Sequence, residues 1–236
     1  MKIFIDSADL KEIEKYKLSG LCQGVTTNPS ICLKCGVANN PEAIKQRIIE
    51  IGRLIAPYPV SVEVTSDNIE EVLTQAREYC CWLDNIAVKV TVTDQNGGSL
   101  LPAIYRLSKE GISVNVTVIT TFNQAIIASR ALMSGREEAI SKPKFSFISI
   151  FAGRIADEHG VDHAFRVVKN FRQWLDFHHY QGIEIIAASI RSKENVELFS
   201  RCGAHILTIP PEIINQYLVS AKTKEGVSIF MADAQK

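Results

Sequence analysis

The sequence lacks an excess of charge of either sign. Among its 236 residues, 26 Lys and Arg balance 26 Asp and Glu. Proteins whose main partner is DNA or another polyanion usually carry a basic excess or a basic stripe, so nucleic acid is not an expected partner. A small anionic ligand remains compatible with this balance.

A long hydrophobic run is also missing near the start of the sequence. The stretch MKIFIDSADLKEIEK has only a short apolar run before Asp6 and is then highly charged. It predicts neither a signal peptide nor a membrane-spanning helix. We therefore expect a cytoplasmic protein with no membrane partner.

Cysteine and histidine show no spacing typical of disulfide frameworks or metal sites. Cys32-x-x-Cys35 could form a redox pair or half of a zinc site, but no second CxxC exists and no histidine is near it, so we interpret the six cysteines as scattered reduced thiols. The five histidines lack the HExxH spacing, and His178-His179 is typical of a solvated helix end. We expect no metal and no other cofactor.

Short β-branched runs alternate with segments that have apolar residues at helical spacing. Eight runs are predicted as strands, over residues 2–6, 24–27, 60–64, 86–92, 113–119, 145–151, 184–189 and 205–209. Alternating strands and helices predict a parallel sheet of right-handed βαβ units, and eight units in a chain of this length predict a (β/α)8 TIM barrel. A six-stranded open sheet is the alternative if two strands are wrong. Residues 1–220 form the predicted catalytic barrel, and residues 221–236 form a tail that either packs on a neighbouring subunit or frays.

Polar residues interrupt nearly every predicted strand near its carboxyl end, where barrels collect their chemistry. They are Asp6, Asn28, Glu63, Lys89, Asn115, Thr117, Ser149 with Arg154 just beyond it, and Ser189 with Arg191. Several have structural explanations: Asp6 could cap a helix, and Asn28 with the following proline could form a turn. Lys89 and Glu63 are harder to dismiss, because buried charges are rare unless paired, and a structural ion pair between them is the main alternative to a functional role.

Lys89 lies in the apolar run IAVKVTVT, residues 86–93. Desolvation there is expected to lower its pKa from about 10.4 and leave a free amine that can attack a ketone and form a Schiff base. Glu63, with a water positioned by Thr117, suits proton transfer during imine formation. Asp6 could take the proton from a hydroxyl as a carbon-carbon bond breaks.

The motifs resemble those of transaldolases, above all the short single-domain branch that includes the fructose 6-phosphate aldolases. They run through almost the whole chain: GVTTNPS, the strand carrying Glu63, VKV around Lys89, GISVNVT, NQA, SIFAGRI and AASIR. The resemblance implies a (β/α)8 barrel in which Lys89 forms the Schiff base, Glu63 and Thr117 act through a water, and Asp6 is the acid/base group of the aldol step.

The same resemblance implies the substrate contacts. Asn28 and Asn115 hold the hydroxyls of a dihydroxyacetone unit, and a guanidinium suits a tetrahedral oxyanion at the far end of the substrate. The expected phosphate pocket consists of Arg154, Ser189 and Arg191. Thr27, Ser149 and Phe151 complete the substrate-binding set.

Two positions separate transaldolase from aldolase within this branch. The aldolases carry Gln in place of Glu63 and Tyr in place of Phe151, so this chain is expected to transfer the dihydroxyacetone unit to an aldehyde such as glyceraldehyde 3-phosphate or erythrose 4-phosphate. An aldolase releasing free dihydroxyacetone is the first alternative. A barrel that binds an anionic sugar without catalysis is the second.

The sequence departs from the family pattern in ways that concern the far end of the substrate. Thr120 replaces an aromatic residue, and an extra charged segment at 134–144 is expected near the anion pocket. These changes slightly favour 6-deoxy-6-sulfofructose, as in the sulfofructose transaldolases, whereas the retained Arg154, Ser189 and Arg191 favour fructose 6-phosphate. The resemblance also implies a homo-oligomer.

Overall fold

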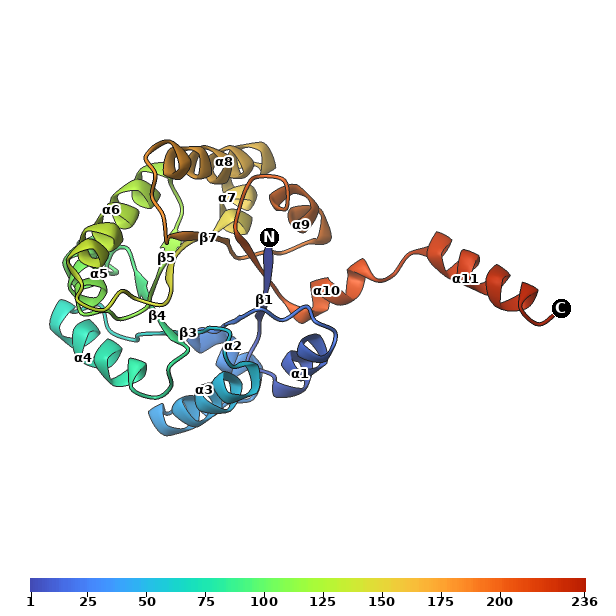
Figure 1. The fold of residues 1–236 in the computed structure, drawn as a ribbon, viewed down its shortest axis with the longest axis horizontal. Coiled ribbons are helices and arrows are strands. Elements are labelled where there is room, and N and C mark those ends of the chain that lie inside the picture. The colour runs from blue at the N-terminus through green and yellow to red at the C-terminus, as the bar shows by residue number, and fades with distance from the viewer.

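The chain forms a closed barrel of eight parallel strands, surrounded by helices (Figure 1). The computed structural model describes residues 1–236. Neighbouring strands pair in sequence order, and the eighth pairs with the first, which confirms the predicted (β/α)8 barrel and excludes the open sheet. The strands are β1 (Lys2–Asp6), β2 (Val25–Thr26), β3 (Val60–Glu63), β4 (Ile86–Thr91), β5 (Val114–Ile119), β6 (Ser146–Ile150), β7 (Glu184–Ala187) and β8 (Ile206–Ile209).

Helices follow every strand, and all except α7 and α8 begin at polar caps or prolines. Asp9, not Asp6, caps the first helix, while Asn28 caps the second through its side chain. Asp6 is therefore free to face the barrel interior. The helices are α1 (Leu10–Leu18), α2 (Pro29–Lys34), α3 (Pro41–Ile55), α4 (Ile69–Cys80), α5 (Leu101–Lys109), α6 (Phe122–Glu138), α7 (Ala152–His159), α8 (Val161–Phe177), α9 (Lys193–Phe199), α10 (Pro211–Tyr217) and α11 (Ala221–Asp233).

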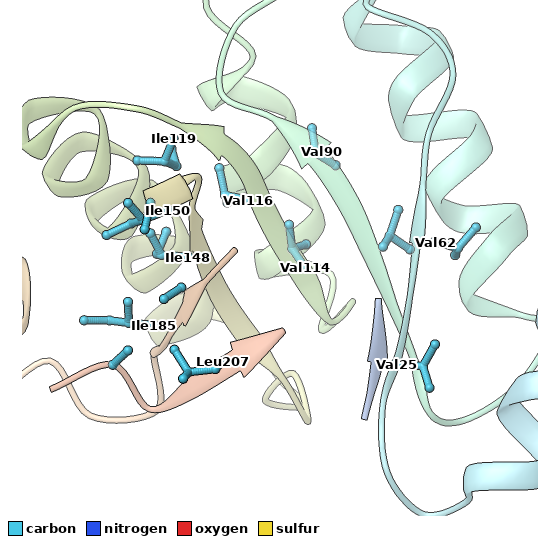
Figure 2. Close-up of a cluster of buried hydrophobic side chains, with 14 of the residues drawn as sticks. Val25, Val62, Val90, Val114, Val116, Ile119, Ile148, Ile150, Ile185 and Leu207 are labelled. Carbon is cyan, nitrogen blue, oxygen red and sulfur yellow. The ribbon is translucent and has the colours of Figure 1, made fainter. Parts of the chain in front are cut away.

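The main core lies between the strands and the helices. Alternate strand residues such as Val25, Val62, Val90, Val116 and Ile148 point outward to it (Figure 2). Because strand side chains alternate between faces, the residues between them point into the barrel. The sequence alternation thus sends one set of side chains to the helices and leaves the other set for the barrel interior.

A smaller hydrophobic cluster fills the barrel interior, mainly toward the amino ends of the strands, and reaches the cavity through Ala188. It contains Phe4, Ala87, Phe147, Ile186, Ala188 and Ile206. On most of these strands a polar residue follows two positions later, as Asp6 follows Phe4 and Lys89 follows Ala87. The interior is therefore apolar at one end and polar at the carboxyl ends of the strands.

The charged segment at 134–144 does not lie near the carboxyl ends of the strands, so the expectation that it borders the anion pocket is wrong. Lys144 pairs at 3.8 Å with Asp84, two residues before β4. A Cβ at Gly111, just before β5, would contact the carbonyl oxygen of Ser141. Loops that precede strands lie at the amino face, opposite the polar end of the barrel.

The last helix, α11, extends away from the barrel (Figure 1). None of its residues is buried, and it exposes Val227, Ile229, Phe230 and Met231. No helix of the chain is both long and apolar enough to cross a membrane. His178 ends α8, as the sequence predicted.

Candidate active site

A cavity of about 210 Å³ opens at the carboxyl ends of the strands. Eight of the predicted site residues line it: Asp6, Asn28, Lys89, Thr117, Ser149, Phe151, Arg154 and Ser189. They come from six different strands and from the segments that directly follow them, including the first turn of α7. Two more, Glu63 and Thr27, contact Lys89 from the side.

Lys89 lies at the floor of this cavity and is almost fully buried. Its Nζ lies 3.0 Å from Oε2 of Glu63 and donates a hydrogen bond of 2.9 Å to the carbonyl oxygen of Thr27. Glu63 and Lys89 are directly opposite each other in the register of the adjacent strands β3 and β4, which explains the contact. The ion pair considered as a structural alternative is therefore present, yet the same amine also faces the cavity. An amine that must lose a proton before it attacks has a carboxylate within reach to accept it.

Glu63 also borders a second cavity of about 410 Å³ between the α2–α3 region and α4. Its side chain is 20% exposed, against 7% for Lys89. Thr27 and Asn28 line this second cavity too, whereas Lys89 does not. Lys89 thus faces the inner cavity and Glu63 the outer one.

Asp6 ends β1 and lines the same cavity as Lys89. Thr26 donates a hydrogen bond of 2.6 Å to Oδ1 of Asp6 and also contacts Thr208. Burial raises the pKa of Asp6 above its usual value, and this effect exceeds the lowering caused by the Thr26 hydrogen bond and by the positive charge of Lys89. A carboxyl group with a raised pKa gives up and takes back a proton closer to neutral pH, which suits an acid/base group.

Asn115 and Thr117 are two residues apart on β5, so both side chains point into the barrel. The Oγ1 of Thr117 is buried and has no hydrogen-bond partner, although it lines the cavity. Buried hydroxyls without a partner are rare, so this one is available to a water or a substrate. Asn115 does not line the cavity: its side-chain amide donates to Ser61 at 3.1 Å and accepts from Ser149 at 2.7 Å.

Arg154 and Arg191 of the expected anion pocket are placed differently. Arg154, in the first turn of α7, lines the cavity with its guanidinium 4.9 Å from the ring centroid of Phe151. Ser189 lines it too, with a positive φ of 60°. Arg191 does not line it: Nη1 of Arg191 pairs with Oδ2 of Asp157 at 2.6 Å. Both side chains of this pair are about half exposed, so the place of Arg191 in the anion pocket stays a prediction.

Six cavity residues were not among the predicted site residues, and they include two threonines and a lysine. Thr26 and Thr208 occupy interior positions of β2 and β8, and Lys34 ends α2. Both threonines could have been identified from the alternation of strand side chains. Thr26 follows the outward-facing Val25, and Thr208 lies between the outward-facing Leu207 and Ile209. Nothing in the local sequence distinguishes Lys34 from other surface lysines.

The chain is similar to known proteins over almost its whole length. The family model described as "Transaldolase/Fructose-6-phosphate aldolase" matches residues 3–236. A "Probable transaldolase" of Streptococcus agalactiae serotype V is 38% identical over 233 residues, covering 99% of this chain and 97% of the relative. The chain belongs to the transaldolase/fructose-6-phosphate aldolase family. A "Probable transaldolase" of Hyphomonas neptunium is also similar, at 35% identity over 236 residues, covering 100% of this chain and 98% of the relative.

Membership in the transaldolase family makes the chain an enzyme of the transferase class. The non-catalytic alternative is thereby set aside. The motifs quoted from the sequence had identified the family correctly, and the barrel supplies the cavity in which their residues meet.

Proposed function

We propose that this transaldolase transfers a dihydroxyacetone unit from fructose 6-phosphate to an aldehyde acceptor, such as glyceraldehyde 3-phosphate or erythrose 4-phosphate, through a Schiff base on Lys89. The observation that carries the proposal is the position of Lys89: an almost fully buried amine that faces the cavity, with the Glu63 carboxylate at 3.0 Å. Asp6 and the unpartnered Thr117 hydroxyl line the same cavity.

The reaction follows from these positions. Glu63 takes a proton from the Lys89 ammonium, and the free amine adds to the ketone carbon of the donor. Loss of water, with protons passed by Glu63 and a water held by Thr117, gives the iminium. The ionised Asp6 then takes the proton from the C4 hydroxyl as the C3–C4 bond breaks, and the electron pair moves toward the iminium nitrogen to form an enamine.

The second half reverses these steps with a new aldehyde. The enamine carbon attacks the acceptor carbonyl, and Asp6 returns its proton to the new alkoxide. Water then adds to the iminium and releases the new ketose from Lys89. Because the enamine waits for an aldehyde, little free dihydroxyacetone is expected.

The donor is proposed to carry a phosphate, although the sequence slightly favoured a sulfonate. The two features behind that expectation lie outside the cavity: the segment at 134–144 is at the opposite face, and Thr120 bonds to the Gln124 side chain at the start of α6. Arg154 and Ser189 line the cavity and suit a phosphate.

A side-by-side assay tests the donor and the reaction type together. The same enzyme preparation is given fructose 6-phosphate or 6-deoxy-6-sulfofructose, with glyceraldehyde 3-phosphate as acceptor. We expect a kcat/KM for fructose 6-phosphate at least about tenfold higher, equivalent to about 1.4 kcal/mol of transition-state binding. A higher value for the sulfonate would reverse the choice of donor. Fast release of free dihydroxyacetone without acceptor would identify an aldolase instead.

We also propose that the chain is a homo-oligomer in which α11 packs on a neighbouring subunit. Val227, Ile229, Phe230 and Met231 are all exposed on this helix, and isolated helices of this length are marginal in water. Removal of residues 221–236 should lower the mass measured by light scattering to that of a smaller assembly. An unchanged mass would show that the tail makes no contact needed for assembly.

A further inference from the structure

The anion end of the cavity has a cation that no family motif supplies. Lys34, the last residue of α2, lines the cavity together with Arg154. Arg191, which pairs with Asp157, does not line the cavity. Lys34 is therefore the second positive side chain at the cavity mouth, in addition to the deep Lys89.

Lys34 and Arg154 lie on opposite walls. Lys34 belongs to the helix after β2 and Arg154 to the helix after β6, and these two strands are four positions apart in a closed ring of eight. An anion at the centre of the mouth would lie between them. Such an anion would be approached from two sides, whereas Arg154 alone approaches it from one.

Lys34 is held by a carboxylate that can be displaced. Its Nζ lies 3.1 Å from Oε1 of Glu212, in the first turn of α10. The two side chains are 75% and 56% exposed, so the pair is solvated and contributes little stability. A phosphate dianion attracts an ammonium more strongly than a single carboxylate does at the same distance.

The pair also lies over the catalytic end of the cavity. Both charges reach Asp6, and they act on its pKa in opposite directions: Glu212 raises it and Lys34 lowers it. Lys34 and Asp6 also line the same cavity, so the Lys34 ammonium faces the space that a bound ketose would occupy.

We propose that Lys34 is a specificity-determining residue that binds the terminal anion of the substrate opposite Arg154, and that Glu212 holds Lys34 in place until the anion arrives. The inference rests on the proposed function, because it assumes that the cavity takes an anionic sugar. It assigns Lys34 and Glu212 a role in recognising the anion only.

Two substitutions with opposite effects test this role. Lys34→Met removes the cation and should raise the KM for glyceraldehyde 3-phosphate and the Kd for fructose 6-phosphate by about fivefold, the factor expected for one exposed charged contact. Glu212→Gln removes the carboxylate that competes with the anion for Lys34, so it should lower both the KM for glyceraldehyde 3-phosphate and the Kd for fructose 6-phosphate. The KM for unphosphorylated glyceraldehyde should not change in either variant.

Lys2→Met is the matched control, because Lys2 forms a similar exposed pair with Glu184, at 2.8 Å, at the amino end of β1. It should change none of these values. If Lys34→Met leaves the KM for glyceraldehyde 3-phosphate unchanged, or raises the KM of both acceptors equally, Lys34 does not bind the anion.

The binding measurement separates this inference from the proposed function. The Kd for fructose 6-phosphate, measured by calorimetry without acceptor, needs no turnover. A Kd that depends on Lys34, in a protein that transfers no dihydroxyacetone, would reject the reaction and keep the anion contact. Normal transfer with a Kd for fructose 6-phosphate that does not depend on Lys34 would keep the proposed reaction and reject the anion contact.

Discussion

Lys89→Arg is expected to abolish transfer of the dihydroxyacetone unit while leaving the barrel folded. Arginine keeps the positive charge that Glu63 and the Thr27 carbonyl require, but a guanidinium cannot form the Schiff base. The rate should fall by on the order of 10⁴- to 10⁶-fold, as when a nucleophile is removed. Steady-state transfer from fructose 6-phosphate to glyceraldehyde 3-phosphate measures the loss, and thermal unfolding measures the fold.

A less conservative variant separates the role of the charge from that of the amine. Lys89→Met should be inactive too, but it leaves the largely buried Glu63 unpaired and should cost about 3–5 kcal/mol of unfolding free energy. Adding Glu63→Gln should restore most of that stability and none of the activity. Stable, inactive Lys89→Arg beside unstable Lys89→Met would show that the ion pair supports the fold and the amine supports the reaction.

Borohydride trapping identifies the bond directly. Incubation of the wild-type enzyme with the ketose donor and borohydride should add one reduced dihydroxyacetone unit at Lys89, found by peptide mass. Lys89→Arg should gain nothing. An unmodified Lys89 after saturating treatment, or modification of another lysine, would overturn the Schiff-base mechanism.

The periodicity of the strands explains why the fold and the catalytic centre could be predicted from the sequence. In IAVKVT, Ala87 and Lys89 are two residues apart and therefore point to the same side, and the closed barrel makes that side the interior. The same rule places Asp6 above Phe4. Burial of Lys89 and its contact with Glu63 follow from this alternation and from the strand register.

Contacts between distant helices could not be predicted in this way. The pairing of Arg191 with Asp157 depends on how α7 packs beside the β7–α9 connection, and the pairing of Lys34 with Glu212 joins α2 to α10. Neither contact has a local sequence signal. The position of the segment at 134–144 was wrong for a different reason: it precedes a strand, and this order alone assigns it to the amino face.

Asp6→Asn is expected to reduce activity by about 10²- to 10⁴-fold, the range typical of a lost general acid/base. An amide cannot take the C4 hydroxyl proton, although its oxygen can still accept the hydrogen bond from Thr26. The kcat for transfer should fall, while binding of fructose 6-phosphate should change little. Asp9→Asn is the matched control, because Asp9 caps α1 outside the cavity and Asn is an equally good cap.

The same variant should be more stable than the wild type at neutral pH. Burial raises the pKa of Asp6 in the folded protein, so the folded state holds this proton more tightly than the unfolded chain does. The stabilising contribution of protonated Asp6 is complete below the unfolded pKa and is lost as the pH rises through the folded pKa. Above that pH the wild type keeps a partly buried, ionised carboxylate that the variant lacks.

Urea unfolding of both proteins across this range measures the difference. The stability advantage of Asp6→Asn should be largest at neutral pH and should shrink as the pH falls toward the unfolded pKa of Asp. Wild-type kcat should decline over the same acidic range, since only ionised Asp6 accepts the proton. If the variant is less stable at neutral pH, or the activity of the wild type does not fall on acidification, Asp6 is held as a structural hydrogen-bond acceptor and another group must serve the aldol step.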